Sequence, residues 1–183
     1  MPAVLVPLAE GCEEIEAVTV VDLLRRGSVT VVTASLGERI VHGNHGIGLE
    51  ADVTLDEALK QSFDMLVLPG GQPGATHLGA DLRIQKLLKK MDQDGRYIAA
   101  ICAAPGVLAE AGLLKGKKAT SFPDAIQDKS GIDYLEAAVV KDGKIITSRG
   151  PGTAMDFGLA LVALLMGEEV RKKVEDRLQR PKK

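Results

Sequence analysis

Residues 97–106 read Tyr-Ile-Ala-Ala-Ile-Cys-Ala-Ala-Pro-Gly, and they carry the strongest indication of fold and chemistry in this chain. A small, apolar, strand-like run ends at Cys102, and small residues with Pro105 then begin a helix. A strand-to-helix turn of this kind raises one side chain above the carboxyl edge of a sheet, as in the nucleophile elbow of hydrolases. A thiol there also lies near a helix N-terminus, whose dipole favours thiolate over thiol. A structural cysteine that closes a buried strand is an equally good interpretation of this stretch alone.

Short apolar runs alternate with helical patterns on both sides of this stretch. The apolar and β-branched runs predict strands over residues 3–8, 29–34, 65–68, 97–102, 138–140 and 145–147. The amphipathic or strongly apolar runs predict helices over residues 13–26, 54–59, 81–94, 105–111, 154–166 and 168–178. Residues 40–49 carry three glycines between apolar residues and predict a hairpin or an irregular extended excursion. Alternation without a linker predicts a single domain over residues 1–183, a doubly wound α/β sandwich with a mainly parallel sheet.

Two of these helices have a predicted buried face. In the helix over residues 13–26, the apolar positions predicted to face the core are Ile15, Val18, Val21 and Leu24 or Leu23. In the helix over residues 81–94, the corresponding positions are Ile84, Leu87, Leu88 and Met91.

The composition excludes several classes of partner. The net charge is −2, there is no Trp, and aromatic residues make up 3% of the chain, so a nucleic-acid surface and binding to an anionic membrane are not expected. No apolar run is long enough for a transmembrane helix. Two cysteines are too few for a disulfide framework. We therefore expect a cytoplasmic protein with reduced thiols.

Glycine-containing loops follow successive predicted strands and should converge at one edge of the sheet. They are residues 10–12 (EGC), 69–71 (PGG), the turn at Cys102 and, after the last hairpin strand, residues 149–152 (RGPG). Each glycine alone is adequately explained as a turn residue. Together the loops indicate a crevice lined by backbone N–H groups, which can stabilise an oxyanion. None of the loops matches a dinucleotide fingerprint or a phosphate-binding loop.

A carboxyl group is available beside this crevice. Glu13, Glu14 and Glu16 begin a helix, and carboxylates in a first turn commonly complement the helix dipole. Glu16 lies one turn further along, where an inward carboxyl can reach the crevice. Beside a thiolate this carboxyl would be protonated, because like charges disfavour each other. The expected result is an acid–thiolate pair that attacks an electrophilic carbonyl.

Four motifs give the chain a resemblance to a known family. They are residues 11–18 (GCEEIEAV), 68–71 (LPGG), 99–103 (AAICA) and 147–153 (TSRGPGT). In this order they resemble the ThiJ/PfpI superfamily, and within it the branch of the parkinsonism-associated protein deglycase and its bacterial homologues. The resemblance covers nearly the whole chain. It implies a flavodoxin-like fold of the class I glutamine amidotransferase-like type and a homodimer.

The resemblance also implies roles for residues. Cys102 would be the nucleophile and an oxidation-sensitive thiol, with Glu16 as its protonated partner. The backbone N–H groups of Gly71 and Ala103 would form the oxyanion hole. The pocket would be completed by Glu13, Gly70, Phe122, Arg149 and Gly150. Members of the family are credited with glutathione-independent glyoxalase activity, repair of methylglyoxal-glycated proteins and nucleotides, and chaperone activity in the oxidative stress response.

The chain departs from the family pattern at two places. The third catalytic position is often a His before a Pro, but here Phe122 precedes Pro123. Because Phe cannot transfer protons, the chemistry rests on Cys102, Glu16 and water, and fast glyoxalase turnover is less expected. His45 stands where relatives often have an Arg near the partner subunit's pocket, and Arg26 matches another basic residue of that surface.

Three further residues have alternative interpretations. His42 and His45 are spaced like metal ligands, but no third ligand is evident in the sequence, so no metal site is predicted. Cys12 should lie beside the crevice, either as a small filler or as a resolving thiol that captures oxidised Cys102.

These observations predict a cysteine-dependent, cofactor-free enzyme of the hydrolase or lyase type. Its substrates would be methylglyoxal-type dicarbonyls or their early adducts on proteins and nucleotides. The alternative is a redox-responsive, stress-protective chaperone or sensor with little turnover, in which Cys102 oxidation is the signal. A flavodoxin-like binder of nucleotide or phosphate is less favoured, because no phosphate loop is present.

Overall fold

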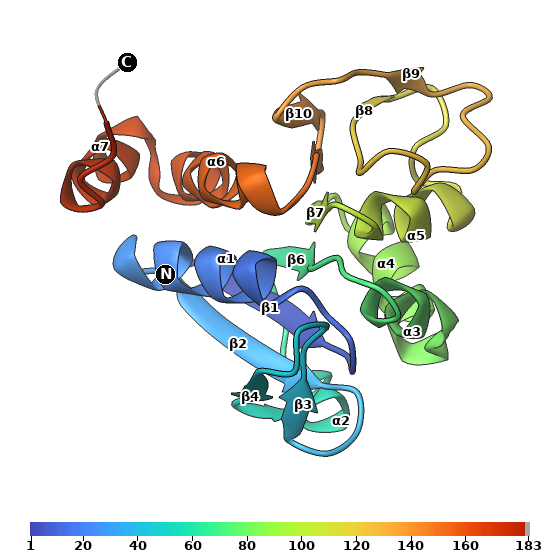
Figure 1. The fold of residues 1–183 in the computed structure, drawn as a ribbon, viewed down its shortest axis with the longest axis horizontal. Helices are drawn as coiled ribbons and strands as arrows, with labels where there is room; N and C mark the ends of the chain where they lie inside the picture. Colours follow the sequence, from blue (N-terminus) through green and yellow to red (C-terminus); the bar gives the residue numbers. More distant parts are fainter. Residues whose placement is uncertain (182–183) are drawn as a thin grey trace.

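A seven-stranded sheet forms the centre of the computed structural model, which describes residues 1–181 (Figure 1). The strands of this sheet are, in spatial order, β10 (Val139–Asp142), β11 (Ile145–Ser148), β7 (Tyr97–Ile101), β6 (Met65–Leu68), β1 (Ala3–Leu8), β2 (Thr30–Ser35) and β5 (Val53–Thr54). All neighbours pair in parallel except β10 and β11, which form an antiparallel hairpin. The predicted mainly parallel sheet is confirmed.

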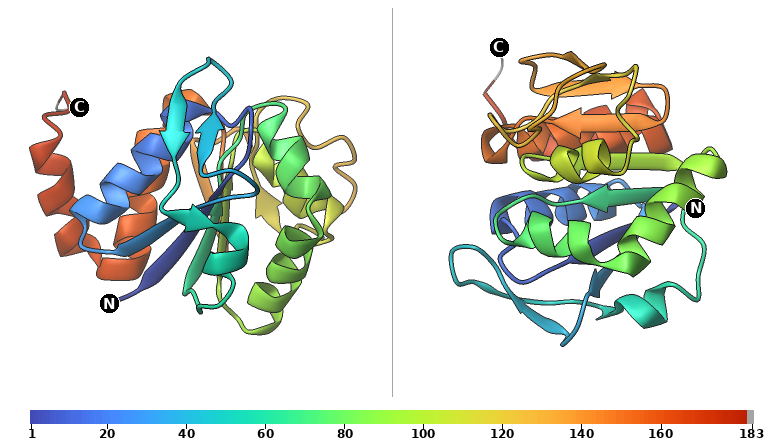
Figure 2. Two further views of the ribbon diagram at one scale, coloured as in Figure 1. Left: turned by 90° about the horizontal axis from the view of Figure 1, so that it is seen from below. Right: turned by 90° about the vertical axis from the view of Figure 1, so that its right-hand side faces the viewer.

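Helices cover both faces of the sheet, so the predicted doubly wound, flavodoxin-like architecture is confirmed (Figure 2, left). On one face lie α1 (Glu14–Arg26) and α6 (Ala154–Met166), with α7 (Glu168–Arg177) packed against α6. On the other face lie α2 (Leu55–Ala58), α3 (Gly74–Ala80), α4 (Leu82–Gln93) and α5 (Ala104–Glu110). No helix within residues 1–181 has the length and apolar character needed to cross a membrane.

Two short strand pairs and a 3₁₀ turn lie outside the main sheet. The predicted hairpin is formed by β3 (Ile40–His42) and β4 (Gly48–Glu50), which pair antiparallel. A small parallel pair consists of β8 (Lys118–Ala119) and β9 (Asp133–Tyr134). A 3₁₀ turn over Pro151–Thr153 leads into α6. The two-residue strands β5, β8 and β9 were not predicted, because two residues are too few to show a strand period.

The predicted inner face of α1 is confirmed at Leu23 and Leu24 but wrong at Ile15 and Val18. Its buried apolar residues are Ala17, Val20, Leu23 and Leu24, whereas Ile15 is 56% exposed and Val18 is 49% exposed. The helix carries apolar residues all round, so a periodicity count alone cannot tell which face meets the sheet. In α4 the prediction holds better, since Ile84, Leu88 and Met91 are buried.

The chain order places a switch point between β1 and β6. After β1 the chain moves to β2 and β5 on one side, and then returns to β6 and β7 on the other. Ligands of open α/β sheets bind outside the carboxyl ends of the strands at such a point. The loops that follow β1, β6 and β7 all meet there, and they carry Glu13, Gly70 and Cys102.

Candidate active site

Cys102 occupies a sharp turn between β7 and α5. Its φ is +64°, a left-handed conformation that non-glycine residues rarely adopt. Two backbone hydrogen bonds hold it there: the Cys102 N–H donates to the carbonyl of Ser148 over 3.0 Å, and the N–H of Phe122 donates to the Cys102 carbonyl over 2.8 Å. The residue is 8% exposed. The predicted elbow geometry is therefore present, and its strained backbone is fixed from both neighbouring segments.

Glu16 projects from the first turn of α1 towards the same point and is fully buried. Its Oε2 accepts a hydrogen bond from the N–H of Gly70 over 2.8 Å. Its Oε1 has no hydrogen-bond partner within residues 1–181. Burial raises the pKa of Glu16 to about 7, although contacts with the Cys102 side chain and with Gly70 lower it. A carboxyl group with that pKa can both accept and return a proton near neutral pH.

The thiol of Cys102 differs from the sequence-based expectation. Burial raises its pKa to about 12, and the charge of the Glu16 carboxylate adds to this increase. The backbone N–H groups of Gly71 and Ala103 lower the pKa, but less than burial raises it. The helix dipole therefore does not by itself make a stable thiolate here. When Glu16 is ionised the thiol keeps its proton, because two negative charges in this buried space would repel each other.

Two glycines bring the β6–α3 loop against the site. A Cβ on Gly70 would lie 2.7 Å from Cys102 Cβ and 2.7 Å from Glu16 Oε2, so no larger residue fits. Gly71 has a φ of +83°, and a Cβ there would lie 2.4 Å from the backbone nitrogen of Glu13. The backbone N–H groups of Gly71 and Ala103 both lower the pKa of the Cys102 thiol. Their role as the oxyanion hole stays a prediction.

The other predicted pocket residues lie around this centre. Phe122 is half exposed, and a Cβ on Gly150 would be 3.5 Å from its ring. Arg149 follows the Ser148 whose carbonyl holds Cys102. The Arg149 Nη1 atom is buried without a hydrogen-bond partner within residues 1–181, and its Nη2 lies 3.9 Å from a carboxylate oxygen of Glu136. A groove of about 270 Å³, lined by Gln72 and Ala103 among others, opens beside the site.

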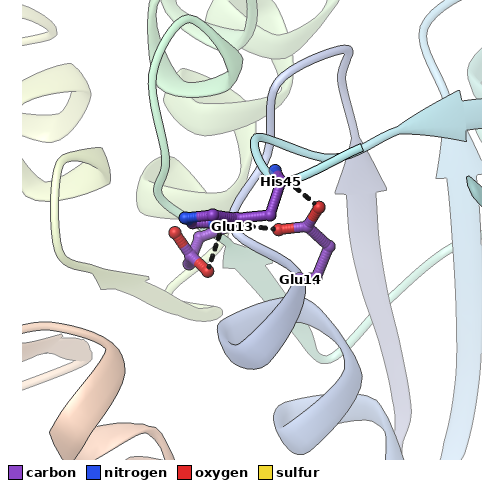
Figure 3. Close-up of side chains that lie close together, drawn as sticks. All are labelled: Glu13, Glu14 and His45. Carbon is purple, nitrogen blue, oxygen red and sulfur yellow. Dashed lines mark hydrogen bonds and ion pairs between the residues drawn. The ribbon is translucent and has the colours of Figure 1, made fainter. Parts of the chain in front are cut away.

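The backbone of Glu13 is hydrogen-bonded to the β6–α3 loop, since its N–H donates to the carbonyl of Gly70 over 3.0 Å. Its side chain turns towards His45 instead, together with that of Glu14 (Figure 3). This juxtaposition was missed by the sequence analysis, because the two segments are more than 30 residues apart. Arg26 forms an ion pair with Asp22 over 2.6 Å at the C-terminal end of α1. Along the helix axis, Arg26 is about 18 Å from Glu14 at the N-terminal end. One chain therefore does not bring Arg26 and His45 together, and their shared role at a partner's pocket stays a prediction.

Cys12 is fully buried beneath the site. Burial, reinforced by the charge of Glu14, raises the pKa of its thiol to about 11. The loop around it is closed by a hydrogen bond from the N–H of Asn44 to the Cys12 carbonyl. A buried thiol with a raised pKa is a poor attacking group, so these features favour the filler interpretation over the resolving thiol.

Comparison with known proteins identifies relatives along nearly the whole chain. The model of the DJ-1/PfpI family matches residues 2–164. Protein DJ-1 homolog B of Arabidopsis thaliana is 45% identical over 170 residues, which cover 92% of this chain but 39% of that protein. The chain thus spans well under half the length of that relative. A deglycase of Pyrococcus abyssi is 33% identical over 165 residues, covering 88% of this chain and 98% of the relative. The crystal structure of Drosophila melanogaster DJ-1beta superposes with a TM-score of 0.94 at 38% identity, covering 99% of both chains.

Proposed function

Because the chain belongs to the DJ-1/PfpI family, we propose that it is a cysteine-dependent, cofactor-free enzyme acting on methylglyoxal-type dicarbonyls or their early adducts on proteins and nucleotides. One observation carries this proposal: the buried Glu16 carboxyl lies beside the Cys102 elbow, and two backbone N–H groups act on the same sulfur. The relative from Pyrococcus abyssi that is named a deglycase supports it.

The proposed first step is addition of the Cys102 sulfur to the aldehyde carbon. Glu16, whose pKa of about 7 leaves a substantial fraction ionised at neutral pH, takes the thiol proton as the S–C bond forms. The aldehyde oxygen accepts hydrogen bonds from the N–H groups of Gly71 and Ala103 and then receives the proton, which gives a neutral hemithioacetal. Glu16 and water carry the later proton transfers. For methylglyoxal the overall reaction is addition of one water to give lactate. For an early adduct, one water is consumed and the products are the free amine and lactate.

Phe122 limits this chemistry. A phenyl ring has no titratable group, so the backbone contact from its N–H to Cys102 fixes the elbow without supplying a proton donor. We therefore expect turnover that depends on Cys102 and Glu16 and is slow.

A redox-responsive, stress-protective protein is the second candidate. The specific observation in its favour is that Glu16 Oε1 has no hydrogen-bond partner in the described part of the chain. Protonated at this oxygen, Glu16 could donate a hydrogen bond to an oxygen of oxidised Cys102 and so stabilise a sulfinate. In this function Cys102 reacts once with an oxidant and turns over little substrate.

We further propose that the protein is a homodimer that works in the cytoplasm, where Cys102 stays reduced. The outer face of α1 carries Ile15 and Val18, which are about half exposed, and Ile47 on the adjoining hairpin is 56% exposed. A groove of about 370 Å³ lies between α1 and β4, lined in part by Val18 and Leu49. An apolar face of this kind fits a second copy of the chain.

The test is consumption of methylglyoxal in large molar excess, with lactate measured as product. Cys102→Ala and Glu16→Gln are compared with the wild type, and His77→Ala, an exposed residue on α3, is the matched control. We expect many turnovers in the wild type and control and none above background in the two site variants. Consumption of a single equivalent would instead favour the redox function, and equal rates in all four proteins would refute both roles of Cys102.

A further inference from the structure

Three metal-ligating side chains from distant parts of the chain meet at the N-terminal end of α1 (Figure 3). Glu13 and Glu14 come from the start of the helix, and His45 comes from the tip of the β3–β4 hairpin. We propose that these three residues bind a divalent transition-metal cation such as Zn²⁺. Its ligands are distinct from Cys102 and Glu16, and the proposal does not depend on the function proposed above.

The distances suit a small cation. One ligand atom of each residue lies within 4.8 Å of the others. His45 Nδ1 is 3.2 Å from Glu14 Oε2 and 3.5 Å from Glu13 Oε1. A tetrahedral ion with bonds of about 2.0–2.2 Å needs neighbouring ligands roughly 3.3–3.6 Å apart. Imidazole nitrogen with carboxylate oxygen is a donor set that Zn²⁺ accepts.

The Glu13 carboxylate has few partners for its charge. Its side chain is 9% exposed, yet within residues 1–181 its carboxylate accepts no hydrogen bond and approaches a cationic group only at His45. An N–H at His45 Nδ1 can satisfy one carboxylate at a time, and Glu14 is the closer. Two largely buried carboxylates that share one imidazole are unfavourable without a further positive charge. A cation between the three side chains would satisfy both carboxylates together.

Glu14 is already oriented for such a role. Its Oε1 accepts hydrogen bonds from the N–H groups of His45 over 2.8 Å and of Ile47 over 3.3 Å. These contacts hold the carboxylate in place and leave Oε2 directed at the imidazole. Hydrogen bonds of this kind commonly orient metal ligands. The His45 side chain is 66% exposed, so water can enter and complete the coordination.

Two other possible cation ligands, His42 and the Cys102 thiol, can be distinguished from the cluster of Glu13, Glu14 and His45. His42, the other histidine of the hairpin, lies 3.8 Å from Glu10 and is not part of the cluster. The thiol of Cys102 could also attract Zn²⁺, so it has to be removed before the site is measured.

The test is calorimetric titration of the full chain with Zn²⁺ in a Cys102→Ala background. We expect one Zn²⁺ per chain, a loss of affinity of at least about tenfold in Glu13→Gln and in His45→Arg, and no change in His42→Ala. His45→Arg alters an exposed side chain and places a positive charge near both carboxylates, so its fold should be retained. X-ray absorption should show nitrogen and oxygen ligands with one imidazole. Equal affinity in His45→Arg and its parent, equal loss in His42→Ala, or a sulfur ligand would overturn the proposal.

Discussion

The small size of Gly70 constrains the site, because its missing side chain leaves the space in which Cys102 and Glu16 approach each other. We predict that Gly70→Ala folds but loses about 10²-fold in methylglyoxal turnover, since a shift of the reacting groups by about 1 Å has effects of that size. Gly79→Ala is the matched control, because its Cβ would lie 3.4 Å from Val107 at the nearest. A Gly70→Ala enzyme with wild-type turnover would show that the close approach is not needed.

At the residue scale, the sequence predicts which residues form the site better than it predicts their ionisation states. Cys102 and Glu16 could be placed together because each follows a predicted strand, and such positions meet at one sheet edge. The ionisation state of Cys102 could not be predicted in the same way, because its raised pKa depends on burial that no local motif reveals. The Glu13–His45 contact was missed for a similar reason, because it joins a helix start to the tip of a distant hairpin.

At the scale of elements, the start of α4 shows how one side chain stabilises a helix. Asp81 is the N-cap, and its Oδ1 accepts a hydrogen bond from the N–H of Arg83 over 2.8 Å. Hydrogen bonds from the Arg83 guanidinium lower the pKa of Asp81. The carboxylate form therefore stabilises the fold above the unfolded-state pKa of about 3.9, and this contribution is lost as the pH falls through the lower folded-state value.

We predict that Asp81→Ala lowers the free energy of unfolding by about 1 kcal/mol at neutral pH. Asp81→Asn keeps a cap but removes the charge, so it should cost less. Denaturant unfolding at several pH values measures both effects. The difference between wild type and Asp81→Asn should shrink as the medium becomes acidic, and a difference that grows towards low pH would contradict a stabilising role of the carboxylate.

Most elements were predictable because their patterns are local. The strand over Ala3–Leu8 and the helix over Ala154–Met166 coincide with the structure. The inward face of α1 was not predictable, because Ile15 and Val18 are as apolar as the residues that reach the core. Their exposure is visible only once the position of the sheet is known.

At the scale of the whole molecule, this exposed face leads to a prediction about assembly. We predict that Val18→Glu shifts the protein from dimer to monomer in sedimentation velocity, because a charge in an apolar interface must be desolvated. Thr76→Glu, an exposed position on α3 on the other side of the sheet, is the control and should leave the dimer unchanged. A wild-type protein that sediments as a monomer would contradict the proposed dimer. A Val18→Glu variant that remains dimeric would show that the interface lies elsewhere.

The central claim is that Cys102 and Glu16 behave as one coupled pair, and alkylation kinetics test it most directly. The rate of modification of Cys102 by iodoacetamide is measured between about pH 6 and pH 10, where thiolate formation controls the rate. Intact mass confirms a single modification, and EDTA keeps cations away from Glu13. Because the Glu16 carboxylate raises the pKa of the thiol, Glu16→Gln should shift the profile to lower pH. Superimposable profiles for wild type and Glu16→Gln would contradict the coupling and the mechanism built on it.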